Sequence, residues 1–252
     1  MFLNPTILKK CLFIDIETVP ATQQFDQMNP EMQDLWIKKS KSLNRDNTEN
    51  QLSTPEESFQ NRAGIYAEFG KIVCISAGYL IFKDGMAEKA RIKSFAGDDE
   101  KQILQEFADL LNEHYNNPER DYICGHNIKE FDIPFICRRM VIQGIRFPAL
   151  LDLSGKKPWQ TIHLLDTMDM WRFGDYKNYT SLLLLSATLG IPSPKDDMDG
   201  SMVGRAYWQE SGLEKITNYC EKDVLTVMQI MLKYAGSPIL PEQKSPDSHN
   251  FD

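Results

Sequence analysis

The sequence predicts an α/β protein in which a mixed sheet is covered by helices. Three observations support this class: an early apolar strand, a hairpin signal around Asp84-Gly85, and a later alternation of strand-like and helix-like segments that ends in helices. With 252 residues, 42% hydrophobic and 25% charged, the chain is long enough for a substantial core. Because neither an internal repeat nor a clear second domain is present, we expect a single domain over residues 1–236.

The N-terminal elements can be assigned in order. Residues 10–17 have the composition of a buried strand, and residues 21–70 are polar with two helix signals, "PEMQDLWIKKSK" and "STPEESFQNRAGIYAEFG". We therefore expect a helical insertion at about residues 21–70. Two strands should follow, one on each side of the Asp84-Gly85 turn.

Helices and strands then alternate along the rest of the chain. Apolar spacing and acidic residues in the first turn predict an amphipathic helix in "DDEKQILQEFADLLNEHYNN". The proline-rich, polar tail at 237–252 is expected to be disordered. Between the two we expect a strand at 121–127, a helix at 131–144, a strand and its exit at 162–171, helices at 180–190 and 203–210, and a long helix from about Leu213 to Tyr234.

Composition excludes several classes of protein. No apolar stretch reaches the roughly 20 residues of a membrane span, and the first ten residues lack the pattern of a signal peptide, so we expect a cytoplasmic protein. The five scattered cysteines include no Cys-x-x-Cys pair, which indicates neither a disulfide scaffold nor a zinc ribbon. A net charge of −8 argues against non-specific nucleic-acid binding but leaves room for a local basic patch.

Two acids stand at the end of the first strand, in "CLFIDIETVP". Alternation along a strand puts Asp15 and Glu17 on one face and Ile14 and Ile16 on the other. Two carboxylates held so close repel each other and need a cation, a proton or ample water. The alternative is a strand end that simply reaches solvent, in the way that the similar pair Asp98 and Glu100 has a plain explanation as a charged helix start.

Two further segments carry acids at element ends or helix faces. Asp132, in "GHNIKEFDIPFI", is a natural helix N-cap, and the preceding strand would bring it to the sheet edge where the first strand ends if the two run parallel. Tyr219 and Asp223 lie four residues apart, on one face of the last helix at the border of its apolar stripe, where packing and solvation are the alternative roles. Four carboxylates on three elements suit Mg²⁺ or Mn²⁺ and match a two-metal hydrolase.

Three motifs in this order resemble a known family. "FIDIET", "HNIKEFD" and "YCEKD" are similar to the exonuclease motifs of the DEDD superfamily, and Tyr219 four residues before Asp223 is typical of its tyrosine-type (DEDDy) branch. "AEFGKIVCIS", "LLDTMDMWRFG" and "LGIPSPKDDMDGSMV" more closely resemble predicted 3′-5′ exonucleases that stand alone and are related to the proofreading domain of family B DNA polymerases. The resemblance covers about residues 10–234 and implies a ribonuclease-H-like (DnaQ-like) fold, with a mixed five-stranded sheet flanked by helices.

The resemblance also implies a mechanism. Asp15, Glu17, Asp132 and Asp223 would ligate two divalent ions, Mg²⁺ or Mn²⁺, and Asp15 would bridge them. One ion would lower the pKa of an attacking water while the other stabilises the leaving 3′ oxygen. Tyr219, a poor general base at neutral pH, is expected to orient that water. The products would be nucleoside 5′-monophosphates. No attached polymerase domain is expected, so proofreading would have to occur in trans.

Four residues are weaker candidates for substrate binding. Asn127 and Phe131 match positions that contact the terminal nucleotide in relatives, although a turn asparagine and a buried phenylalanine would give the same pattern. Thr18 could contact the substrate end or merely finish the strand, and Lys195 could meet a phosphate or be a solvated loop residue. These alternatives stay open at the level of sequence.

Other polar residues near the motifs have mainly structural explanations. Asp166 is expected to play a structural role, and His126 to be a turn histidine rather than a zinc ligand. A backbone-binding patch could come from Lys129, Arg138 and Arg139, but helix geometry separates the two arginines by about 100°, so that at most one faces a groove.

The leading hypothesis is a metal-dependent 3′-5′ exonuclease on single-stranded DNA, with an unidentified DNA repair or replication partner. An exoribonuclease or oligonucleotide degrader is the alternative within the same chemistry, because motifs do not reveal contacts to a 2′-hydroxyl. A non-catalytic nucleic-acid-binding or partner-binding module on the same fold is the alternative from a different class. The intact set of carboxylates argues against this last alternative, since a non-catalytic module has no reason to tolerate their repulsion.

Overall fold

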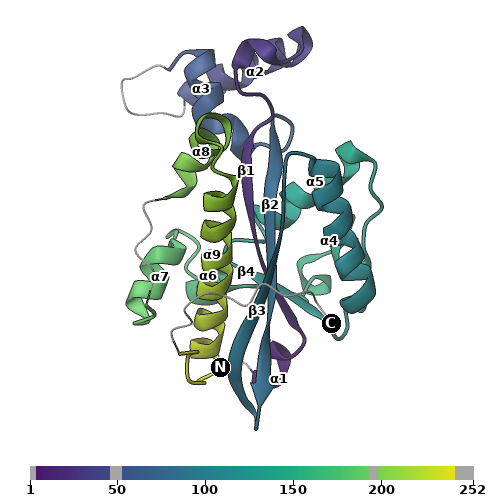
Figure 1. The fold of residues 1–252 in the computed structure, drawn as a ribbon, viewed down its shortest axis with the longest axis vertical. Helices are drawn as coiled ribbons and strands as arrows, with labels where there is room; N and C mark the ends of the chain where they lie inside the picture. Colours follow the sequence, from purple (N-terminus) through teal and green to yellow (C-terminus); the bar gives the residue numbers. More distant parts are fainter. Residues whose placement is uncertain (1–3, 46–52, 193–197, 242–252) are drawn as a thin grey trace.

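A mixed five-stranded sheet forms the centre of the protein. The computed structural model describes residues 4–45, 53–192 and 198–241 (Figure 1). Strand order is β3-β2-β1-β4-β5, with β1 in the middle. β2 runs antiparallel to β1 and β3, whereas β1, β4 and β5 run parallel to one another. The strands are β1 (Cys11–Pro20), β2 (Gly70–Lys83), β3 (Met86–Ala96), β4 (Tyr122–Gly125) and β5 (Leu164–Asp166).

The turn between β2 and β3 confirms the predicted hairpin. Lys83 pairs with Met86 across a two-residue loop. Both loop residues have positive φ, 50° at Asp84 and 83° at Gly85. An Asp-Gly pair adopts this conformation readily, and its twist matches that of the flanking strands.

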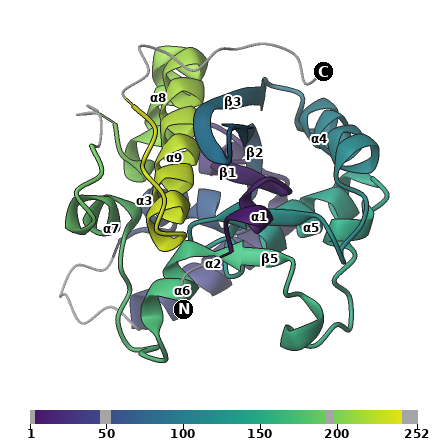
Figure 2. The same ribbon diagram turned by 90° about the horizontal axis from the view of Figure 1, so that it is seen from below.

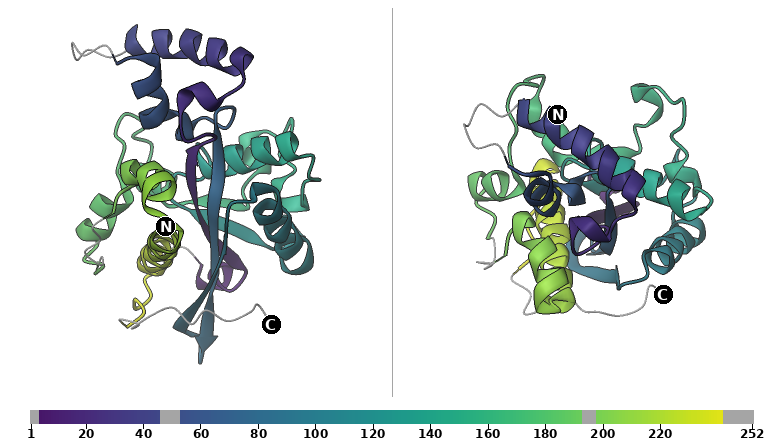
Figure 3. Two further views of the ribbon diagram at one scale, coloured as in Figure 1. Left: turned by 45° about the horizontal axis from the view of Figure 1, so that its top comes forward. Right: turned by 90° about the horizontal axis from the view of Figure 1, so that it is seen from above.

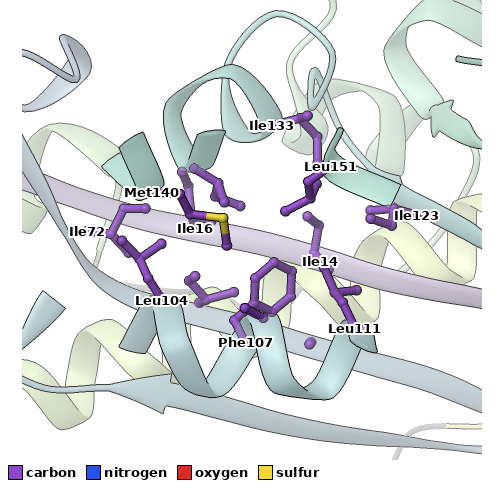
Figure 4. Close-up of a cluster of buried hydrophobic side chains, with 14 of the residues drawn as sticks. Ile14, Ile16, Ile72, Leu104, Phe107, Leu111, Ile123, Ile133, Met140 and Leu151 are labelled. Atoms are coloured by element: carbon purple, nitrogen blue, oxygen red, sulfur yellow. The ribbon is translucent and has the colours of Figure 1, made fainter. Parts of the chain in front are cut away.

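One face of the sheet is covered by α4 (Glu100–His114) and α5 (Asp132–Gln143), in the same order as predicted (Figures 1 and 2). Ile14 and Ile16 of β1 enter the core on this side, where they meet Leu104 and Phe107 of α4 (Figure 4). Alternation along β1 therefore directs its even-numbered residues to this face. Asp15 and Glu17 consequently belong to the opposite face.

The opposite face is covered by the long helix α9 (Leu213–Tyr234) (Figure 2). Its buried stripe follows the predicted spacing, with Ile216, Cys220, Val224, Val227 and Met231 all 1% exposed or less. Phe13 of β1 packs against the central part of this stripe. The contact between α9 and the sheet is thus apolar around the place where β1 carries Asp15 and Glu17.

The remaining elements surround this layered centre. α2 (Pro30–Arg45) and α3 (Pro55–Arg62) lie at one end of the molecule, where Trp36 and Phe59 form a separate small core (Figure 3). No helix in the described ranges is both long and apolar enough to cross a membrane. The other helices are α1 (Pro5–Leu8), α6 (Thr167–Arg172), α7 (Leu182–Thr188) and α8 (Val203–Glu210), with 3-10 turns at Phe25–Gln27, Ala63–Ile65, Ala149–Leu151, Pro158–Gln160 and Gly200–Met202.

Two sequence-based expectations need correction. Glu100 begins α4 as expected but is only 5% exposed, because its carboxylate pairs with the buried Arg139 of α5 (Nε to Oε1, 2.8 Å). The expected disorder of the tail is wrong for residues 237–241. There Leu240 is buried and both of its backbone groups hydrogen-bond with the Gln229 side chain. Residues 242–252 lie outside the described part of the chain.

The Glu100–Arg139 pair yields a test of the fold. Glu100 also accepts hydrogen bonds from Ile72 N and from Gln143 Nε2, so one carboxylate joins α4, α5 and β2. Glu100→Ala would leave the Arg139 charge buried without its partner, and should lower the free energy of unfolding by about 3–5 kcal/mol. Urea denaturation measures this loss. The exposed Glu106→Ala on the same helix should change stability by less than about 0.5 kcal/mol. Equal effects of the two variants would contradict a structural role for the pair.

Candidate active site

The centre of the candidate site is the acid pair on β1. Glu17 is 7% exposed, and both carboxylates lie on the face covered by α9. Cys220 of α9 donates from Sγ to the Asp15 carbonyl oxygen at 3.4 Å, which joins the helix to the strand at this point. Ligand atoms of Asp15, Glu17 and Cys220 all lie within 4.8 Å of one another. The prediction that Asp15 and Glu17 share a face is thereby confirmed, and the nearby thiol was not foreseen.

The third acid, Asp132, lies where the neighbouring strands β1 and β4 separate. β1 pairs with β4 only as far as Phe13 and Cys124. Beyond this point Gly125 lies so close to its surroundings that a Cβ atom would stand 2.0 Å from Ile128 Cγ2 and 2.8 Å from the Ile14 carbonyl oxygen. Only glycine permits this approach. The chain then turns back, and α5 begins beside the part of β1 that no longer pairs with β4.

Asp132 occupies the first position of α5. It is 3% exposed, and its carboxyl hydrogen-bonds with its own backbone and with that of Ile16 on β1. The expectation that Asp132 is the helix N-cap is therefore wrong by one residue, because Phe131 holds that position and the helix includes Asp132. Besides this contact with its own backbone, the carboxyl reaches the backbone of β1. Its place at the sheet edge where β1 and β4 diverge is as predicted.

The last helix brings a carboxylate and a phenol to the same place. Tyr219 and Asp223 are both partly buried at the border of the α9 stripe, one helical turn apart. The Tyr219 hydroxyl hydrogen-bonds with Asp223 and lies in the field of Asp15 and Glu17, so burial and these charges raise the Tyr219 pKa well above its usual value. The phenol therefore stays protonated at neutral pH and serves as a hydrogen-bond donor.

The carboxylates strongly perturb one another. Burial raises the pKa of Asp15 well above its ordinary value, and the charges of Asp223, Asp132 and Glu17 raise it further. Burial also raises the pKa of Glu17, and the charge of Asp223 raises it further. The pKa of Asp132 rises to about 7, mainly through burial. In the protein without a bound cation, protonation of the carboxylates relieves this repulsion.

The donor set fits a divalent cation. No lysine or arginine of the described ranges forms an ion pair with Asp15, Glu17 or Asp132. Hard carboxylate oxygens are the ligands that Mg²⁺ and Mn²⁺ prefer. Burial raises the pKa of the Cys220 thiol, so this group stays neutral and is a poor ligand for such ions. Carboxylates alone would hold the cation.

A cavity of about 440 Å³ opens onto this cluster. Asp15, Tyr219 and Asp223 line it, whereas the more buried Glu17 and Asp132 do not. The other lining residues were not predicted as site residues, because only the three motifs that carry the carboxylates and Tyr219 gave a clear signal, and His126 was expected to be a turn residue. These additional lining residues include His126, Tyr179, Ser181, Leu182, Ser186 and Lys222.

Asp166 organises the loop between β4 and α5. It is 2% exposed and caps α6 by accepting from Met168 N and Asp169 N. It also accepts from Asn127 N (2.9 Å) and Lys129 N (3.1 Å), so one carboxylate holds two loops together. This arrangement agrees with the structural role expected for Asp166.

His126 connects the same loop to the other side of the cavity. Its Nδ1 hydrogen-bonds with Thr167 Oγ1 and its Nε2 donates to the Thr180 carbonyl oxygen, each at 2.9 Å. Burial lowers the pKa of His126, so the ring is neutral near pH 7. The histidine thus ties the segment before α7 to the end of β4, which matches its expected role as a turn residue.

The candidate substrate-binding residues differ in their surroundings. Asn127 has a positive φ of 64°, and its Oδ1 is buried without a hydrogen-bond partner among the described residues. Phe131 packs against the α5 core beside Phe135, and the alternation of β1 places Thr18 away from the face of Asp15 and Glu17. Neither lines the cavity. Lys195 lies outside the described residues.

Fold and site together define a nuclease-like α/β protein with a carboxylate cluster at the parting of two parallel strands. The chain belongs to the family described as predicted 3′-5′ exonucleases related to the exonuclease domain of PolB, whose model matches residues 65–237. The match includes Asp132, Tyr219 and Asp223, whereas Asp15 and Glu17 lie before it. The description of this family agrees with the exonuclease class that the sequence motifs predicted.

A solved structure supports the fold. The family B DNA polymerase from the hyperthermophilic archaeon Pyrobaculum calidifontis matches with a TM-score of 0.52 at 14% sequence identity. The match covers 88% of this chain and 24% of the polymerase, so this chain spans about a quarter of that protein. The expected ribonuclease-H-like architecture is confirmed by this likeness. No curated protein matches the chain.

The carboxylate cluster predicts an unusual dependence of stability on pH. In metal-free protein the folded state binds protons more tightly than the unfolded state, because the pKa of Asp132 is about 7 instead of 3.8. Its contribution to the free energy of unfolding should therefore fall as the pH rises from about 4 to about 7. Thermal unfolding in EDTA measures this fall. Asp132→Asn should flatten the slope, and Mn²⁺ at pH 8 should stabilise the wild type. A variant with the same slope as the wild type would contradict the assigned pKa.

Proposed function

We propose that the protein is a metal-dependent 3′-5′ exonuclease that hydrolyses the terminal phosphodiester of single-stranded DNA. The observation that carries the proposal is the convergence of Asp15, Glu17 and Asp132 beside Tyr219 and Asp223, with no ion pair from a lysine or arginine of the described ranges to the first three. Such a cluster is unfavourable for folding unless it binds something positive. Family membership supplies the reaction class, and the geometry supports metal-assisted hydrolysis.

Each residue has a distinct role in the proposed reaction. Asp15, Glu17, Asp132 and Asp223 would hold two divalent ions, Mg²⁺ or Mn²⁺. When bound, these ions would activate water and stabilise the leaving 3′ oxygen. Tyr219, whose phenol stays protonated because its pKa is raised, would donate a hydrogen bond to orient the attacking water. The products would be nucleoside 5′-monophosphates.

Features of the cavity favour a single strand end. A volume of about 440 Å³ lies within the range of sites that hold small ligands, and it suits the end of one strand. Leu182 and Tyr179 supply apolar and aromatic surface for an unstacked base, and Lys222 supplies a positive charge beside the acids. Asn127 lies on the loop between β4 and α5, but it does not line this cavity and its Oδ1 is buried, so the cavity as it stands gives Asn127 no contact with a nucleotide. Relatedness to a DNA polymerase domain favours DNA, and a role in proofreading in trans or in repair.

Removal of single carboxylates tests the metal-dependent mechanism. Asp15→Asn and Asp223→Asn should each lower the rate of 3′ shortening by at least about a hundredfold, because the ions lose a charged ligand. The assay follows a 5′-labelled single-stranded oligonucleotide with Mg²⁺ or Mn²⁺. Mn²⁺ binding is measured separately by isothermal titration calorimetry and should weaken in both variants. Glu119→Gln, an exposed carboxylate in a distant loop, serves as the control. Full activity of Asp15→Asn, or shortening from the 5′ end, would refute the proposal.

Replacement of the tyrosine separates orientation from metal binding. Tyr219→Phe keeps the ring but removes the hydroxyl that hydrogen-bonds with Asp223. We expect kcat to fall by about tenfold to a hundredfold, while the affinity for Mn²⁺ measured by calorimetry stays within about twofold of the wild type. A large loss of Mn²⁺ affinity would assign Tyr219 to the metal site instead.

A substrate panel decides between DNA and RNA. Matched DNA and RNA oligonucleotides, single-stranded, recessed and mismatched, should be compared by kcat/KM with each ion. We expect single-stranded DNA to be preferred over its RNA counterpart by about tenfold or more. A preference for RNA would establish the exoribonuclease alternative, and binding without cleavage in every case would establish the non-catalytic module.

A further inference from the structure

A second cavity lies on the other side of the molecule. It has a volume of about 640 Å³, and its walls come from α5 and from the segment 147–161, with Leu164 of β5 at its edge. It shares no lining residue with the cavity at the carboxylates. α5 and α7, which border the two cavities, stand on opposite sides in both views (Figures 1 and 2). The second cavity is therefore a separate groove, which we call the α5 groove.

The α5 groove is mainly aliphatic. Ile133 and Leu151 form buried parts of its lining, and Val141 remains 66% exposed at its edge. Trp159 belongs to the segment 147–161, which forms one wall of the groove, and Ile162 follows it directly. Each of these two side chains is 70% exposed. Solvent-exposed apolar side chains around a preformed hollow are typical of protein interaction sites. Phe147 is the single aromatic residue among the described residues that line it, so the groove has no row of rings for stacking bases.

Its charged residues are all of one sign. Lys129, Arg138, Lys156 and Lys157 line the groove, and none of the described lining residues is acidic. Lys129 pairs with Asp169 (2.8 Å). Arg138, Lys156 and Lys157 make no ion pair with any residue of the described ranges. The net charge of the chain is −8, so a groove with apolar lining and only basic charged residues differs in charge from the protein as a whole.

We infer that the α5 groove binds an acidic peptide segment of a partner protein, in which carboxylates stand next to large apolar side chains. The apolar side chains would enter the groove between Ile133 and Leu151, while the carboxylates pair with Arg138 and Lys157 at its border. A nucleic-acid strand fits less well, because the walls are aliphatic and the groove is not continuous with the candidate active site. This site is independent of the proposed nuclease chemistry.

Selection from a random library tests the class of ligand. A phage-displayed library of random dodecapeptides is selected on the wild-type protein and on the double variant Arg138→Glu/Lys157→Glu. The wild type should enrich sequences in which acidic residues adjoin large apolar ones, and the double variant should not. The leading sequence, made as a fluorescein-labelled peptide, should bind the double variant at least about tenfold more weakly by fluorescence anisotropy. High salt should also weaken its binding to the wild type.

A matched variant controls for the change in net charge. Lys38→Glu/Lys41→Glu reverses two exposed lysines of α2, which contributes no lining residue to the groove, and should bind the peptide as the wild type does. This control variant should also shorten a 5′-labelled oligonucleotide at the wild-type rate, because neither lysine lines the cavity at the carboxylates. Failure of the nuclease proposal alone would leave the peptide results unchanged.

Cysteine protection locates the bound peptide. Cys137 lines the groove and is partly exposed, while Cys11, Cys74, Cys124 and Cys220 are buried. Alkylation of Cys137 by N-ethylmaleimide, followed by mass spectrometry, should slow in the presence of the peptide and not in the presence of oligo-dT. Enrichment of no acidic and apolar motif, equal binding by Arg138→Glu/Lys157→Glu, or protection by oligo-dT alone would overturn the inference.

Discussion

The separation of β1 from β4 is the constraint on which the candidate site depends. Parallel pairing ends at Phe13, and the close approach of Gly125 lets the chain turn back at that point. On the side away from β2, the backbone of Ile16 then hydrogen-bonds with the Asp132 carboxyl instead of with β4. The end of pairing with β4 thus leaves one edge of β1 open, and the start of α5 lies against it. α9 closes the gap from the other face, so that three elements meet over a few residues.

Buried acids in this protein fall into two groups. Asp166 and Glu100 are as buried as Asp132, but the first accepts several backbone N–H groups and the second pairs with Arg139. Their charges are satisfied within the protein, and they hold loops and helices together. Within the described part of the chain, Asp15 and Glu17 receive no comparable set of donors, and their pKa values are raised by burial and by neighbouring acids. The contrast separates carboxylates whose charges are satisfied by the protein from the cluster that we propose to bind metal ions.

Local sequence patterns predicted those parts of the structure that depend on local geometry. Strand alternation placed Asp15 and Glu17 together, and the spacing of one helical turn placed Tyr219 beside Asp223. Patterns failed where the partner is distant in sequence: Glu100 looked like a solvated helix start because Arg139, 39 residues away, carries no local signal. The depth of the carboxylates, the approach of Cys220 and the α5 groove likewise depend on tertiary packing. At Asp132 the prediction was wrong by one residue because the helix already includes Asp132, whose carboxyl also hydrogen-bonds with the backbone of Ile16 on β1.

The contact between Cys220 and Asp15 joins residues 205 positions apart. During synthesis, the strand that bears the first two acids emerges long before the helix that bears the last one, and the cluster cannot assemble until α9 has docked. Contacts of such long range form slowly, since much of the chain must be ordered before they close. A nascent or truncated chain lacking α9 would lack Tyr219 and Asp223 as well as the apolar cover of one face of the sheet. The order of the polypeptide thus delays assembly of the candidate nuclease centre until nearly the whole domain has left the ribosome.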